Sequence, residues 1–208
     1  MSLILKFYYF YVGCIIIPVI TGVWYFRYLD KSSRVLLWML ILALFQSILT
    51  LFVLNGEDFS DKWVENLYIV VDIIMMYWFY YTASESQIFR QILLLVYLSM
   101  ISLYFVSTKL ETSINFFPGF QSLIFNATAL LFFNYLLKNN SNKSILDNPL
   151  FWFNTGLLLN SIVLVLRIYS SVLAEESFGY YQQLYIFFYM IGISVNLLFA
   201  IGFRKSKT

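Results

Sequence analysis

Seven long apolar stretches follow one another along the chain, and this pattern constrains the fold more than any other feature. A helix needs about 20 mainly apolar residues to cross the hydrocarbon core of a bilayer. The stretches cover residues 7–27, 35–54, 64–83, 91–107, 121–138, 150–173 and 181–203. The polar segments between them are too short to form soluble domains. The pattern predicts an all-α polytopic bundle of seven transmembrane helices, with residues 1–208 as a single membrane domain in contact with the lipid bilayer.

Composition agrees with a membrane protein and excludes several classes of function. Hydrophobic residues make up 61% of the chain and charged residues 12%, against about 45–50% and about 25% in soluble domains. There is no histidine and only one cysteine, Cys14, so metal sites built on imidazole or paired thiolates are excluded. The chain has no catalytic motif and no interior basic run. We expect no enzyme activity, no metal, no cofactor and no nucleic-acid partner.

Lysine and arginine are distributed unequally between the two ends of the expected helices. One end carries Arg27, Lys31, Arg34, Arg90, Lys138, Lys143, Arg204, Lys205 and Lys207, and the other carries Lys6, Lys62 and Lys109. Cytoplasmic loops are enriched in these residues. The bias predicts an N-terminus outside and a C-terminus in the cytoplasm.

Local breaks refine the boundaries of two of the stretches. Asp147, Asn148 and Pro149 are typical of a capped helix start, with proline in the first turn. Pro118 and Gly119 predict a break in the chain before the fifth span.

Two formal charges lie well inside expected spans. Asp72 lies about seven residues from the outer end of its span, and Arg167 about six from the outer end of its own. These separations correspond to about 10 Å and about 9 Å of helix. Because charges inside a bilayer usually face the bundle and have partners, the similar depth predicts an ion pair between them. The alternatives are an Arg167 that extends to the headgroups and an Asp72 that is protonated or bonded to tyrosine.

Further polar side chains share helix faces with these charges. Asn160 lies seven residues before Arg167, and Tyr68 lies four before Asp72, which places each pair on one face. The candidates for a ligand-binding pocket in the outer half of the bundle are Asp72, Arg167, Tyr68, Asn126, Asn160, Gln182 and Tyr185. For any single Asn or Gln, a hydrogen bond between helices is the simpler interpretation.

A weak internal repeat links two parts of the sequence. Trp38 precedes Gln46 by the same spacing as Trp152 precedes Asn160, and both polar residues are followed by Ser-Ile. NLYI at 66–69 is also similar to QLYI at 183–186. A duplication predicts a bundle of three, one and three helices, as in some transporters. Chance similarity in a chain rich in Leu, Ile and Tyr is the alternative.

Two stretches, NLYIVVDI (66–73) and DNPLFWFNTGLLL (147–159), resemble small multi-spanning membrane proteins of Bacteroidota whose function is unassigned. Some of these resemble sensory modules that accompany signalling kinases. In that group the third span carries a histidine and, six residues on, a glutamate. Asn66 and Asp72 occupy those positions here, so the carboxylate is kept in kind while the imidazole is absent. The resemblance implies a bacterial cytoplasmic membrane and a role in signalling.

Three functions are compatible with these observations. The first is a non-enzymatic, receptor-like or partner-binding module with a polar pocket in its outer half. Its output would need a membrane or cytoplasmic protein partner, because the cytoplasmic loops are short. The second is a small-solute transporter of 3+1+3 architecture, and the third is a structural subunit of a membrane complex.

Overall fold

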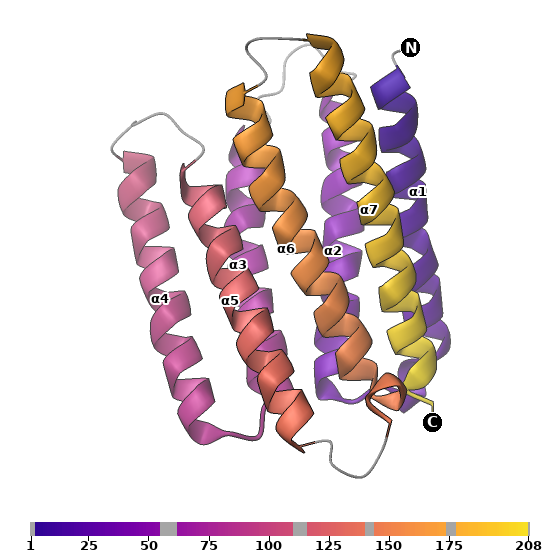
Figure 1. Ribbon diagram of the computed structural model, residues 1–208, viewed down its shortest axis with the longest axis vertical. Coiled ribbons are helices and arrows are strands. Elements are labelled where there is room, and N and C mark those ends of the chain that lie inside the picture. The colour runs from indigo at the N-terminus through magenta and orange to yellow at the C-terminus, as the bar shows by residue number, and fades with distance from the viewer. Residues whose placement is uncertain (1–2, 55–61, 110–115, 140–143, 174–177, 208) are drawn as a thin grey trace.

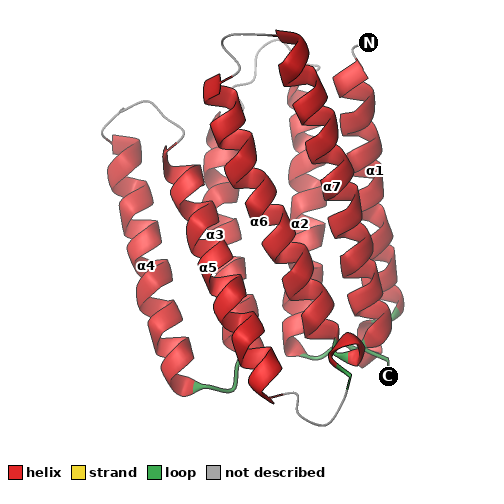
Figure 2. Ribbon diagram, viewed as in Figure 1, coloured by secondary structure: helices red, strands yellow, loops and turns green. Residues whose placement is uncertain are grey.

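The computed structural model describes residues 3–54, 62–109, 116–139, 144–173 and 178–207. Within these ranges the chain forms seven α-helices and no strand (Figure 2). They are α1 (Leu3–Trp24), α2 (Lys31–Leu54), α3 (Lys62–Ala83), α4 (Gln87–Lys109), α5 (Phe116–Asn139), α6 (Pro149–Leu173) and α7 (Phe178–Lys205). Short 3-10 turns, η1 (Phe26–Tyr28) and η2 (Ile145–Asp147), lie in two of the connections. The all-α prediction is confirmed.

The helices are arranged in chain order around the bundle (Figure 1). Each helix packs on the next, and α7 returns to pack on α1. In the view of Figure 1, α4, α5, α6 and α7 lie in front and α3, α2 and α1 behind, with α4 at one edge. The two termini lie at opposite ends of the bundle. An odd number of helices that alternate in direction produces this arrangement.

Six of the helices are long and apolar enough to cross a membrane, counting only the described residues. Their apolar spans are Lys6–Trp24, Lys31–Thr50, Gln87–Val106, Phe117–Asn139, Pro149–Leu166 and Gln183–Lys205. The corresponding part of α3, Leu67–Ala83, is shorter. The whole of α3 has 22 residues, or about 33 Å at about 1.5 Å per residue, which is close to the thickness of a hydrocarbon core.

Capping side chains explain where two helices begin. The Asp30 carboxylate accepts hydrogen bonds from the Ser33 backbone N–H and the Ser32 hydroxyl, each at 2.8 Å, at the start of α2. The Asn148 side-chain oxygen accepts the Leu150 backbone N–H at 2.9 Å, and Pro149 is the first residue of α6. The cap expected at this position is therefore confirmed.

The expected break at Pro118 and Gly119 is wrong, because α5 already begins at Phe116. Pro118 is the third residue of the helix. The N–H that proline lacks has no partner within the helix in a first turn, so the residue is tolerated there.

Four of the five tryptophans lie toward one end of the bundle, and the fifth, Trp63, is in the first turn of α3. Trp24 is the last residue of α1 and is 80% exposed, while Trp38 and Trp78 are exposed near the start of α2 and the end of α3. Trp152, in the first turn of α6, donates its indole N–H to the Leu146 carbonyl at 2.8 Å. All four lie toward the end that holds the C-terminus and most of the described cations. Tryptophan is enriched at membrane–water interfaces, so these residues indicate where the bundle leaves the hydrocarbon.

The half of the bundle nearer the C-terminus has a dense aromatic core. We call this part of the bundle the packed half. Its fully buried side chains include five aromatic residues and one asparagine: Phe79, Tyr80, Phe132, Phe153, Phe203 and Asn154. The rings of Tyr80 and Phe132 meet edge to face with centroids 5.3 Å apart, and those of Phe153 and Phe203 lie 4.9 Å apart. Tyr80 donates to the Asn154 side-chain oxygen at 2.9 Å, and the Asn154 amide donates to the Ala129 carbonyl at 2.9 Å. One asparagine thus ties α3, α5 and α6 together.

Candidate functional site

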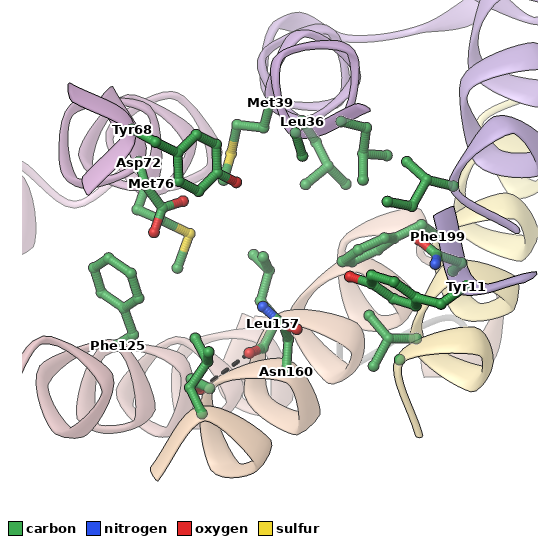
Figure 3. Close-up of a pocket in the computed structure, with 18 residues that line it drawn as sticks. Tyr11, Leu36, Met39, Tyr68, Asp72, Met76, Phe125, Leu157, Asn160 and Phe199 are labelled. Carbon is green, nitrogen blue, oxygen red and sulfur yellow. Dashed lines mark hydrogen bonds between the residues drawn. The ribbon is translucent and has the colours of Figure 1, made fainter. Parts of the chain in front are cut away.

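A cavity of about 110 Å³ lies among the helices beyond the packed half (Figure 3). We call it the central cavity. It is lined by Tyr11, Ile15, Leu36, Met39, Leu40, Ala43, Tyr68, Asp72, Met76, Phe125, Leu157, Asn160, Ser161, Leu164, Gly192, Val195, Asn196 and Phe199. These residues come from α1, α2, α3, α5, α6 and α7, and no described residue of α4 is among them. One water takes about 30 Å³ in the liquid, so the cavity has room for a few waters or one small solute.

A smaller cavity of about 80 Å³ adjoins the central one. The two share Tyr11, Asn160 and Gly192 among their lining residues. The Tyr11 ring lies directly against Gly192, where an added Cβ would come within 2.6 Å of it. Close approach of a ring to a backbone is what a glycine at a helix interface permits. The side chains of Tyr11 and Asn160 therefore lie between the two cavities and line both.

Asp72 provides the central cavity with a carboxylate at mid-helix. It lies ten residues after Lys62 and eleven before Ala83. Gln121 of α5 donates its side-chain amide to Asp72 Oδ2 at 3.1 Å. Among the side chains that the structure describes, the only ion pair joins Lys205 Nζ to Asp147 Oδ1 at 2.7 Å, far from this site. The observed partner of the Asp72 carboxylate is therefore a neutral amide.

The expected pair of Asp72 with Arg167 stays a prediction, because the Arg167 side chain lies outside the described residues, as does that of Gln182. The helix bounds do alter the argument from depth. Arg167 lies six residues before the end of α6, about 9 Å, whereas Asp72 lies about 15 Å into α3. Measured along the helices, Asp72 therefore lies further from the end of its helix than Arg167 does.

Of the other candidate residues, Tyr68 and Asn160 line the central cavity together with Asp72. Asn126 does not. It accepts a hydrogen bond from Ser161 Oγ at 2.9 Å and donates to the Ser122 carbonyl at 3.0 Å, so it lies between α5 and α6 while Phe125 faces the cavity. Its interaction is the link between helices that is the simpler interpretation of such a residue.

Tyr185 also lies outside the lining of both cavities. Its ring packs on those of Phe188 and Tyr189, with centroids 6.2 and 6.3 Å away. It precedes the cavity residue Gly192 by seven positions, so it shares that face of α7 about two turns further out. Tyr185 thus lies on the cavity-facing side of α7 but outside the lining of both cavities, and its role in ligand binding stays a prediction.

Asn196 belongs to the site although it is not among the sequence-based candidates. It lines the central cavity and is only 4% exposed. Its amide nitrogen is buried and, within the described part of the chain, has no hydrogen-bond partner. A buried polar group left unpaired costs about 1–3 kcal/mol. A residue that lines the central cavity thus has an amide nitrogen without a described partner.

The repeat in the sequence does not extend to this site. Gln46, the counterpart of Asn160, does not line the cavity. It donates to Thr50 Oγ1 on its own helix at 3.3 Å. The two positions therefore have different surroundings, and the 3+1+3 arrangement stays a prediction.

Comparison of the chain with models of protein families, with curated proteins and with solved structures gives no match. The class of the protein therefore rests on its own fold. Six long apolar helices, an outer surface rich in exposed Leu, Ile and Phe, and an interfacial group of tryptophans define an integral membrane protein with several helical spans.

Proposed function

We propose that this protein is a receptor-like membrane module that binds a small polar solute in the central cavity. The observation that supports this most is the composition of the cavity. It combines a mid-helix carboxylate whose described partner is neutral with a buried amide that has no described partner. Polar and ionisable groups inside a membrane are costly and usually serve a function. A bound solute would supply the missing interactions.

The proposed signal depends on which helices hold the polar groups. Asp72 lies on α3, Asn160 on α6 and Asn196 on α7. A solute that contacts all three favours one spacing of these helices over others, and a ligand shifts a conformational equilibrium by its difference in affinity for the two states. In the proposed mechanism the solute competes with Arg167 for Asp72. The connections at the C-terminal end pass the change to a separate protein partner.

A thermal unfolding assay of the purified protein in mild detergent tests this proposal. A panel of small cationic, neutral and anionic solutes is added to the wild type, to Asp72→Asn and to Ser99→Ala. Ser99 is exposed on α4, away from the cavity, and serves as the control. A solute at 100 times its Kd stabilises the folded state by about 2.7 kcal/mol. We expect at least one solute to stabilise the wild type and Ser99→Ala but not Asp72→Asn. No response to any class of solute would exclude the proposal.

A transporter is the second candidate, and the position of Asp72 favours it. Substrate sites of secondary transporters lie near the middle of the membrane, and Asp72 lies at the middle of α3. Flux of the solute into proteoliposomes, lost in Asn160→Leu, would support transport. Solute binding without flux would support the receptor-like module.

A further inference from the structure

The charge of the central cavity points to the sign of its ligand. Among the lining residues that the structure describes, Asp72 alone carries a formal charge, and the other ionisable groups are the phenols of Tyr11 and Tyr68. No lysine or arginine belongs to this described set. An ionised carboxylate inside a membrane favours a cation beside it and repels an anion.

The walls of the cavity favour an organic cation over a bare metal ion. The rings of Tyr11, Tyr68, Phe125 and Phe199 and the thioethers of Met39 and Met76 surround it (Figure 3). Aromatic faces attract ammonium groups, and the rings and thioethers together also pack against hydrocarbon. The described residues hold no group of three or more metal-ligating side chains of the His, Cys, Asp and Glu types. The lining suits a positive charge carried on a short hydrocarbon.

The wall opposite Asp72 offers neutral hydrogen-bonding groups. Figure 3 shows Tyr68 and Asp72 on one side of the cavity and Asn160 across from them. Asn160 and Asn196 lie on α6 and α7 and present amides, which donate and accept hydrogen bonds. A ligand that spans the cavity therefore has a positive group at one end and a neutral polar group, such as a hydroxyl, at the other. The volume of about 110 Å³ limits it to a few carbon atoms.

We infer that the solute is a small primary ammonium ion with a neutral polar tail, of the amino-alcohol kind. Its ammonium group binds the Asp72 carboxylate, which keeps its hydrogen bond from Gln121. Its tail binds Asn160 and Asn196. This inference rests on the proposed function, because it names the ligand class of the same cavity.

Titration of the full chain in neutral detergent with three probes of matched size tests the charge. The probes are ethanolamine hydrochloride, ethylene glycol and sodium glycolate, at constant pH and ionic strength, with thermal unfolding as the readout. We expect ethanolamine alone to raise the unfolding midpoint in a saturable way. Asp72→Asn should weaken its binding about tenfold or more, because a hydrogen bond to a charged group is lost. Glu85→Gln, an exposed carboxylate in the α3–α4 connection, should leave binding unchanged.

A second variant tests the binding of the ligand's neutral polar end. This test remains informative even if Asp72→Asn does not fold. Asn160 is exposed to the cavities, so Asn160→Leu should be tolerated. It should weaken binding of ethanolamine and leave binding of ethylammonium, which has no hydroxyl, unchanged. Equal weakening of both probes would overturn the assignment of Asn160 to the tail.

The remaining outcomes separate this inference from the proposed function. Binding of glycol or glycolate that depends on Asp72, without binding of ethanolamine, overturns the ammonium ligand and leaves a solute-binding module. Binding of ethanolamine in Arg167→Leu but not in the wild type shows that the arginine already fills this role, and it also overturns the inference. No binding of these probes or of the wider panel overturns both.

Discussion

Two buried asparagines differ in a way that separates the halves of this bundle. Asn154, in the packed half, is 0% exposed, accepts the Tyr80 hydroxyl and donates to the Ala129 carbonyl. Asn196, beside the central cavity, is 4% exposed and has an amide nitrogen without a described partner. The oxygen and the nitrogen of Asn154 each have a partner, whereas the nitrogen of Asn196 has none among the described residues.

The difference indicates what each half contributes. A polar side chain whose oxygen and nitrogen both have partners on neighbouring helices helps to fix the arrangement of those helices. A buried group that lacks a partner makes the unoccupied state less stable, so a ligand that completes it is favoured. Under the proposed function, the packed half serves stability and the central cavity serves binding.

The largest effect is expected when the paired asparagine is removed. Asn154→Leu leaves the Tyr80 hydroxyl buried without its acceptor, and it should lower the free energy of unfolding by about 2–3 kcal/mol. Unfolding of the purified variant in detergent micelles measures the loss.

The matched control for this change is the double variant Asn154→Leu/Tyr80→Phe. Removing both partners of a buried hydrogen bond costs less than removing one. The double variant should therefore be more stable than Asn154→Leu alone. A double variant that is less stable would show that the Tyr80 hydroxyl still stabilises the fold without Asn154, and would contradict the assignment of the loss to an unpaired hydroxyl.

The next largest difference in stability is expected between two glycine-to-alanine variants, one in each half of the bundle. A Cβ at Gly202 would overlap the ring of Phe153, which is fully buried and cannot move aside, so Gly202→Ala should cost about 1–3 kcal/mol. At Gly192 the overlap is with Tyr11, which faces the cavity and can shift into it. Here the gain in helix propensity, up to about 1 kcal/mol, should offset most of the strain.

The same unfolding measurement compares the two alanine variants, and a solute titration adds a second readout. Gly192→Ala moves the Tyr11 ring into the cavity, so it should reduce solute binding while stability is kept. Equal destabilisation by both variants would mean that the cavity half is packed as rigidly as the other half.

Much of the fold could be predicted from sequence because the membrane requires it. Each expected span overlaps one observed helix, since a backbone in lipid must satisfy its own hydrogen bonds within a helix. The exception at Pro118 has a local cause, because the first turn of a helix tolerates proline. Hydrophobicity identifies a span but does not set where its helix begins, and α3 starts at Lys62, before the apolar stretch Leu67–Ala83.

The site was predictable only where a rare residue revealed it. Asp72 stands out in an apolar run, and Tyr68 and Asn160 follow from helical spacing. Asn196 shares a helix face with Tyr185, eleven residues before it, but nothing in the sequence distinguishes Asn196 or Gln121 from an Asn or Gln that bonds a neighbouring helix. Whether such a residue is paired depends on the rotation and level of the facing helices, and tertiary packing alone determines these.

The smallest effect on stability, and the sharpest test of the comparison, is expected for Asn196→Leu. Leucine is close to asparagine in size and has no polar group to leave unpaired. The variant should therefore be as stable as the wild type or more stable by up to about 1 kcal/mol, whereas Asn154→Leu loses stability. It should also lose part of the stabilisation that a bound solute provides. A loss of stability as large as that of Asn154→Leu would mean that Asn196 is paired in the folded protein, and the distinction between a structural half and a binding half would then fail.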